Sequence, residues 1–117
     1  MRFFFTKTDR ILKRSDYIRL QNTGTKISNA HFIVSCLPGI YKRSRLGITV
    51  TRKVGNAPAR NRIKRCAREF FRLNRHVLKG GWDIVIIAKK EALGLAPSQI
   101  SSSLRNVFDR MSRNVDS

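Results

Sequence analysis

The chain has 117 residues, close to the usual size of one domain, and 41% of them are hydrophobic, so it can bury a core and is not a disordered polycation. Its 25 Lys and Arg stand against 7 Asp and Glu, which gives a net charge of +18. Such a charge favours a nucleic-acid partner over an anionic membrane surface, because the cations are spread along the chain and are not gathered on one terminal helix.

No stretch approaches the length of a transmembrane helix, and the run from Phe3 to Phe5 is far shorter than the core of a secretory signal. We therefore expect a cytoplasmic protein with no membrane partner and no small-molecule substrate. Cys36 and Cys66 form no C-x-x-C pair and fall in apolar patterns, which predicts reduced thiols that serve as small buried hydrophobes. We expect one nucleic-acid-binding domain over residues 1–117, with residues 1–8 and 113–117 flexible.

The first half of the chain predicts a short helix followed by strands. Ser15 is the expected N-cap of a helix that runs to about Asn22 and is ended by Gly24. A short extended piece at residues 26–28 follows, and residues 31–37 alternate as a strand that is covered on both faces.

The second half predicts strand, helix, strand and helix. Residues 46–53 form a strand with one apolar face and one polar and basic face, and residues 59–77 form a long helix after the breakers that precede it. Residues 82–88 form a buried strand, and a last helix follows Pro97. The order α-β-β-β-α-β-α predicts an α+β fold, a two-layer sandwich of helices on a sheet.

The helix at residues 59–77 has two contrasting sides. Winding at about 100° per residue gathers six residues on an apolar side: Ile63, Cys66, Ala67, Phe70, Phe71 and Leu73. The opposite arc carries Asn61 and five cations: Lys64, Arg65, Arg68, Arg72 and Arg75. Arg60 and Arg62 lie at the positive end of the helix, and Glu69 is the one acid, so the cations repel each other and favour an anionic partner.

The segment from Thr51 to Phe70, TRKVGNAPARNRIKRCAREF, closely resembles the signature of the bacterial ribonuclease P protein family, with Arg60-Asn61-Arg62 at its centre. The resemblance extends upstream to residues 12–17, LKRSDY, and downstream to residues 79–85, KGGWDIV. It implies a left-handed strand-helix-strand crossover, against the strong general preference for right-handed ones.

The resemblance also implies two RNA-binding regions. One contacts the catalytic RNA and the nearby tRNA through Arg52, Lys53, Asn56, Arg60, Asn61, Arg62, Lys64, Arg65, Arg68 and Arg72. The other is a cleft between the first helix and the sheet that binds the single-stranded 5′ leader of precursor tRNA, lined by Tyr17, Gln21, Ser35, Thr49 and Thr51. Gln21 and Ser35 stand where the family has aromatics, so leader preference is expected to differ.

The acids are scattered, with successive ones at least seven positions apart, which disfavours a self-contained metal-dependent nuclease. The resemblance implies that the RNA subunit carries out Mg²⁺-dependent hydrolysis, with Mg²⁺ held mainly by that RNA and the substrate, and that the protein has no catalytic residue of its own. No metal ligand is assigned. The alternatives are a ribosomal or RNA-chaperone type of binding module and a basic nuclease that acts alone.

Overall fold

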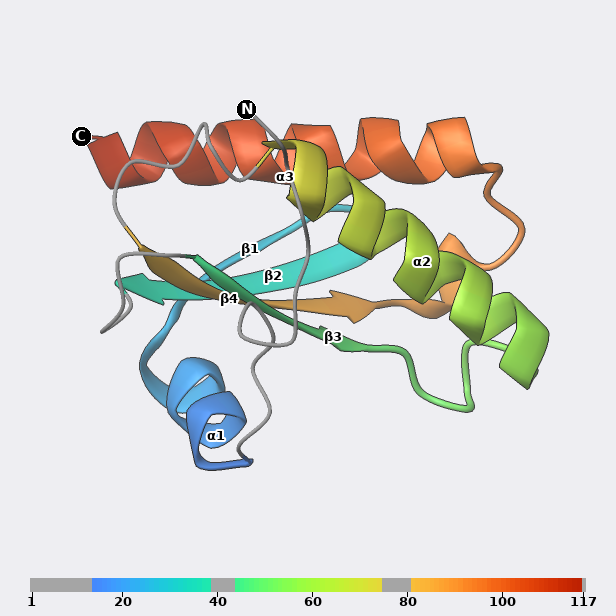
Figure 1. Cartoon of the computed structure of the whole chain (residues 1–117), viewed down its shortest axis with the longest axis horizontal. Helices are drawn as coiled ribbons and strands as arrows, with labels where there is room; N and C mark the ends of the chain where they lie inside the picture. Colours follow the sequence, from blue (N-terminus) through green and yellow to red (C-terminus); the bar gives the residue numbers. More distant parts are fainter. Residues whose placement is uncertain (1–13, 39–43, 75–80, 117) are drawn as a thin grey trace.

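The computed structural model describes residues 14–38, 44–74 and 81–116 (Figure 1). The predicted order of helices and strands is confirmed, with one additional 3₁₀ turn, η3. The elements are α1 (Arg14–Thr23), β1 (Thr25–Ser28), β2 (Phe32–Pro38), β3 (Arg45–Thr49), α2 (Ala57–Asn74), β4 (Trp82–Ala88), η3 (Lys90–Ala92) and α3 (Pro97–Asp116). Of the segments predicted to be flexible, residues 1–8 and 117 lie outside the described residues, and residues 113–116 continue α3. No helix in the described part of the chain is long and apolar enough to cross a membrane.

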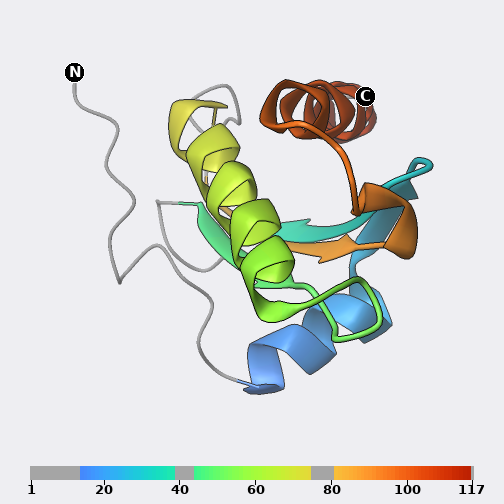
Figure 2. The same cartoon turned by 90° about the vertical axis from the view of Figure 1, so that its right-hand side faces the viewer.

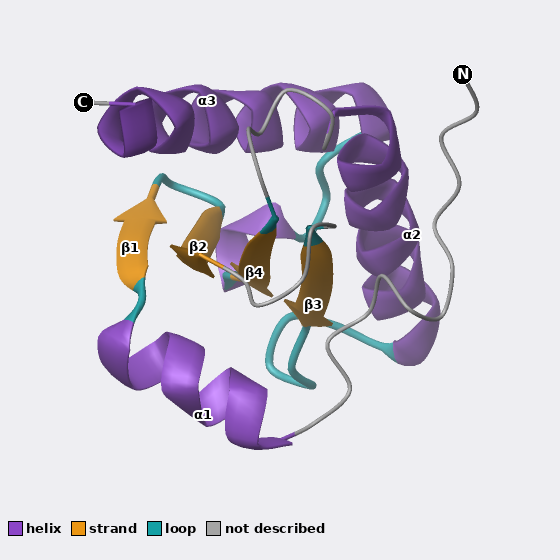
Figure 3. Cartoon of the chain, turned by 60° about the vertical axis from the view of Figure 1, so that its left-hand side comes forward, coloured by secondary structure: helices purple, strands orange, loops and turns teal. Residues whose placement is uncertain are grey.

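One mixed sheet has the strand order β1-β2-β4-β3, so the last strand in sequence lies between the second and third (Figure 3). β2 pairs antiparallel with β1 and with β4. In the pairing of β2 with β4, Ser35 lies opposite Val85. β3 pairs parallel with β4 from Arg45 opposite Asp83 to Thr49 opposite Ile87. The parallel pair is joined through α2, which makes a strand-helix-strand unit.

This unit has the left-handed crossover that the family resemblance implies. In Figure 1, β3 and β4 both point to the right and α2 runs back to the left above them. Figures 2 and 3 place β3 on the near side of β4 in that view. The path from β3 through α2 to β4 therefore turns counterclockwise as it recedes from the viewer, which is left-handed, whereas about 98% of such units are right-handed.

Helices cover the two faces of the sheet unequally. α2 and α3 form a complete layer over one face, and the main apolar core lies between them and the sheet (Figure 2). The short α1 lies against the other face, where Leu20 packs on Val85 with Leu37 and Ile87 at the edge of the contact. Among the described side chains, α1 therefore makes a much smaller apolar contact than α2 or α3.

β3 is shorter than the predicted strand over residues 46–53. Its parallel pairing ends at Thr49 opposite Ile87, and β4 itself ends one residue later at Ala88, so from Thr51 onward β4 offers no residue to pair with. The chain turns instead, with the backbone N–H of Val54 donating to the carbonyl of Thr51 at 3.0 Å, while Val50 and Val54 are buried in the core. Thr51 is exposed in this turn and does not lie on a strand face.

Three sequence predictions about the helices are corrected. Ser15 lies inside α1 and is not its N-cap, because Arg14 is already helical. α2 begins at Ala57, two residues earlier than predicted, because the side-chain oxygen of Asn56 accepts a hydrogen bond from the N–H of Ala59 at 3.0 Å and so caps the helix. Leu73, predicted on the apolar side, is 45% exposed because it lies at the rim of that side.

α2 is fixed to α3 by contacts near its C-terminal end. The rings of Phe70 and Phe108 meet edge to face, with centroids 5.0 Å apart and an interplanar angle of 87°. The guanidinium of Arg105 lies 5.7 Å from the centre of the Phe70 ring and donates to Asn74 at 3.3 Å. These contacts set the rotation of α2 about its own axis, and with it the direction in which the opposite side faces.

Candidate nucleic-acid interface

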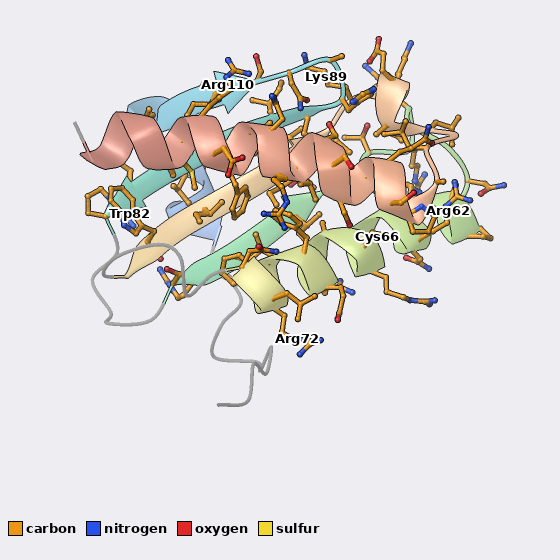
Figure 4. The ribbon with its side chains drawn as sticks, turned by 90° about the horizontal axis from the view of Figure 1, so that it is seen from above. Arg62, Cys66, Arg72, Trp82, Lys89 and Arg110 are labelled. Carbon is orange, nitrogen blue, oxygen red and sulfur yellow. The ribbon has the colours of Figure 1, made fainter. Side chains whose placement is uncertain are left out.

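The surface of α2 that faces away from the core is the candidate site. Ile63, Ala67, Phe70 and Phe71 are buried against the sheet and α3, which confirms most of the predicted apolar side, and Cys66 is partly buried beside them. The opposite side is turned outward by the same helical winding. Figure 4 shows Arg72 pointing away from α3, and Arg62 lying near the N-terminal end of the helix.

We define the cationic arc as Lys64, Arg65, Arg68 and Arg72. Arg65 is exposed, and the other three are partly exposed. Lys64, Arg65 and Arg68 make no hydrogen bond or ion pair with another described residue. Three cations are therefore held along one side of a rigid helix, and no acid among the described residues neutralises them. Arg75, the fifth predicted cation of this side, lies outside the described residues.

Arg72 is the exception in the cationic arc, because Glu69 binds it. The Nε of Arg72 donates to Glu69 Oε2 at 3.1 Å, and its Nη2 forms an ion pair with Oε1. The hydrogen bond from Arg72 lowers the pKa of the Glu69 carboxyl and raises that of the Arg72 guanidinium. Glu69 therefore stays ionised at neutral pH and cancels part of the positive charge at this end of the arc.

The N-terminal end of α2 carries three more of the predicted residues. Asn61 and Arg62 are exposed, as the prediction requires of residues that contact a ligand. Arg60 lies half-buried on the core side of the helix, and its Nε is shielded from water with no partner in the described part of the chain. The helix N-terminus adds its own positive partial charge at this end.

The turn before α2 brings two further cations next to the same end of the helix. Arg52 and Lys53 are both exposed, and neither forms an ion pair with another described residue. The third predicted residue of this segment, Asn56, has a structural role that the sequence pattern did not predict, since it caps α2. The cap both starts the helix and fixes the position of the turn that carries Arg52 and Lys53.

The five residues predicted to line a cleft lie on the opposite face of the sheet or next to it. Tyr17 and Gln21 lie on α1, but their side chains are outside the described residues. Thr49 is half-buried, and Thr51 is exposed in the turn beyond β3. Ser35 is 1% exposed, and its hydroxyl has no hydrogen-bond partner among the described residues. The Ser35 side chain is therefore covered by other atoms in this structure and does not line an open cleft.

A buried charge cluster on this face was not predicted. Asp83 is fully buried and accepts hydrogen bonds from Arg45 Nε at 2.9 Å and Arg45 Nη2 at 2.7 Å. It also accepts one from Arg19 Nη2 at 2.9 Å. The sequence carries a signal for this cluster, because Asp83 is the single charge in an apolar strand and a buried carboxylate requires partners. The signal does not say which of the 25 Lys and Arg those partners are.

Comparison with known proteins decides the family. The family model described as Ribonuclease P matches residues 5–112. The chain belongs to the ribonuclease P protein family. It is 47% identical over 110 residues to the ribonuclease P protein component of Desulfatibacillum aliphaticivorans, covering 94% of this chain and 93% of that protein. It is 44% identical over 115 residues to that of Desulfosudis oleivorans, covering 98% and 95%.

Solved structures of the ribonuclease P protein family have the same fold. The Staphylococcus aureus RNase P protein is 35% identical, with a TM-score of 0.85 over 90% of this chain and 96% of that one. The Thermotoga maritima RNase P protein is 34% identical, with a TM-score of 0.78 over 86% and 96%. As a ribonuclease P protein, the chain is a subunit of a tRNA-processing endonuclease and a partner of the RNase P RNA. No comparison favours the ribosomal or RNA-chaperone alternative.

Proposed function

We propose that the chain is a single RNA-binding domain that grips the catalytic RNA of ribonuclease P with α2 and guides the 5′ leader of precursor tRNA between α1 and the sheet. The observation that carries the first part is the cationic arc, in which Lys64, Arg65 and Arg68 have no acidic partner among the described residues. Binding to RNA phosphates would relieve the repulsion among these cations. It would also release the counterions that are condensed on the RNA.

Rigidity makes this arc suitable for folded RNA. The residues from Lys64 to Arg72 rise about 12 Å along the helix axis at 1.5 Å per residue. Because α2 is fixed by its buried side and by the contact between Phe70 and Phe108, the bases of these side chains keep their spacing before RNA arrives. Because the backbone of α2 is already ordered, the conformational entropy that this helix loses on binding RNA comes from its side chains and not from its backbone.

The proposed division of labour leaves the metal-dependent chemistry to the RNA. Two of the described carboxylates are already engaged, Asp83 with two arginines and Glu69 with Arg72. Within the described part of the chain, no three His, Cys, Asp or Glu side chains come together as ligands. We assign Mg²⁺ mainly to the RNA subunit and the substrate, as the family resemblance implies. The protein then acts by binding and positioning RNA in the cytoplasm, where bacterial precursor tRNA is made.

Reconstitution tests this function. Precursor tRNA is incubated with the purified chain, with the cognate RNase P RNA, and with both, at a low Mg²⁺ concentration where the RNA alone is slow. We expect the chain alone to leave the precursor intact and the mixture to release the leader rapidly. Polylysine of equal total charge is the control for simple charge screening. Leader release by the chain alone, or equal stimulation by polylysine, would contradict the proposed function.

A further inference from the structure

The Asp83 carboxylate joins three elements of the structure on the face that α1 covers. Arg45 at the start of β3 binds both carboxylate oxygens, and Arg19 of α1 binds Oδ2 at 2.9 Å. The side chain of Asp83 is 0% exposed and that of Arg45 is 11% exposed, whereas that of Arg19 is 38% exposed. Arg45 therefore holds the carboxylate in place from within the sheet, and Arg19 attaches to it from outside.

Among its described side chains, α1 has few other attachments to the sheet. The one buried apolar residue of its described side chains is Leu20, which packs on Val85. Ile18, its neighbour on the same helix, is 45% exposed. The helix ends soon after this contact, where the N–H of Gly24 donates to the carbonyl of Leu20 at 3.0 Å. A single apolar contact leaves a short helix free to roll about its own axis unless a second contact prevents it.

Helix geometry places Arg19 where it can prevent this roll. At about 100° per residue, Arg19 is displaced by about 100° to one side of Leu20, while positions 17 and 21 are displaced by about 60° and 100° to the other side. The ion pair with Asp83 therefore fixes one flank of α1. The opposite flank carries Tyr17 and Gln21, the two α1 positions assigned to the leader cleft.

We propose that Arg19 and Asp83 form a latch that sets the rotation of α1 and thereby presents positions 17 and 21 to the single-stranded leader. This inference rests on the proposed leader-guiding function. In it, Arg19 and Asp83 are positioning residues that act through α1. The latch is separable from folding, because Arg45 still pairs with Asp83 when Arg19 is removed, so that no buried charge is left without a partner.

The first test is Arg19→Gln in the reconstituted ribonucleoprotein. Affinity is measured for precursor tRNA with a leader of several nucleotides and for the matching tRNA without a leader. We expect binding of the leader-bearing RNA to weaken roughly 3- to 10-fold, the usual net effect of one hydrogen bond whose charge is screened by partial exposure, with no change for the leaderless RNA. Arg19→Lys keeps a cation that can reach the carboxylate and is expected to recover most of the affinity.

Two further variants separate the latch from a direct phosphate contact. Lys90→Gln removes an equal charge from the exposed η3 turn and should leave leader affinity unchanged. Asp83→Asn keeps the Arg19 cation but weakens its attachment. It also removes the carboxylate that pairs with Arg45, so its leader affinity is compared only after circular dichroism shows that the variant is folded. In a latch, Asp83→Asn reduces leader affinity and Arg19→Gln adds little in that background, because both remove the same coupling. If Arg19 instead contacts a leader phosphate directly, Arg19→Gln weakens leader binding by the same factor in the Asp83→Asn background as in the unmodified chain.

Each outcome decides the inference. Equal weakening for RNA with and without a leader, an unchanged affinity in Arg19→Gln, or a full additional loss in the Asp83→Asn background would overturn the latch. These results differ from a failure of the proposed function, in which the unmodified ribonucleoprotein itself binds both RNAs equally. The thermal unfolding of the Arg19→Gln chain, followed by circular dichroism, confirms that the fold is kept.

Discussion

Cys36 and Cys66 have the same chemistry, but the fold gives them different surroundings. Cys36 lies in the centre of β2 at 1% exposure, and burial raises the pKa of its thiol to about 11. Cys66 lies on α2 and is only partly buried, and both cysteines are free. The prediction of two buried reduced thiols is therefore confirmed fully for Cys36 and in part for Cys66.

The two thiols should react at different rates. We expect Ellman's reagent at pH 8 to modify one thiol per folded molecule, Cys66, and two after denaturation, because the thiolate is the reactive form and Cys36 is kept protonated and covered. Cys66→Ser should abolish the fast reaction. Because folding raises the pKa of Cys36 from 9.0 to about 11, the folded state holds its proton more tightly, so this residue makes unfolding easier as pH rises across that range. Two equally fast thiols in the folded chain would contradict this account.

At the scale of the element, periodicity predicted which helices and strands exist, but not all of their ends. The two faces of α2 and the strand at residues 82–88 follow from the spacing of apolar residues. The end of β3 could not be predicted in this way, because it depends on where its partner strand ends. The start of α2 was readable in principle, since Asn56 is a preferred N-cap residue, but the resemblance had assigned Asn56 to RNA binding.

The cap and the RNA surface can be tested separately at Asn56. We expect Asn56→Ala to lower the free energy of unfolding by about 1 kcal/mol, the usual effect of losing an N-cap side chain. Asn56→Asp keeps a capping oxygen and should unfold at the same or a higher urea concentration, measured by circular dichroism. The added negative charge beside Arg52 and Lys53 should nonetheless weaken RNA binding. If Asn56→Ala leaves stability unchanged, the cap does not contribute as the structure indicates.

At the scale of the whole molecule, the sequence indicated the partner better than the topology. The charge of +18 and the two-sided pattern of the residues in α2 are enough to favour a nucleic-acid partner, and the family resemblance specified RNA. The strand order β1-β2-β4-β3 and the left-handed crossover depend on long-range pairing that no local pattern contains, and the handedness came from the family resemblance alone. The Asp83 cluster is equally long-range, since Arg19 and Asp83 are 64 positions apart in the chain.

The arrangement of the molecule nevertheless explains why these features go together. The crossover places α2 on the same face as α3, so that its apolar side is buried and its cationic arc is exposed. The opposite face is left to α1, held by Leu20 and Arg19. One sheet thus separates the surface proposed for the catalytic RNA from the cleft proposed for the leader.

The salt dependence of binding to the RNase P RNA tests the central claim most directly. Arg65→Gln removes an exposed member of the cationic arc, and Lys26→Gln removes an exposed cation from β1, at the other edge of the sheet from β3. We predict that Arg65→Gln reduces the slope of log K against log salt by roughly 0.7 to 0.9, the contribution of one neutralised phosphate, and that Lys26→Gln leaves the slope unchanged. An unchanged slope for Arg65→Gln, or equal reductions in both variants, would contradict a role for α2 as the surface that grips the RNA.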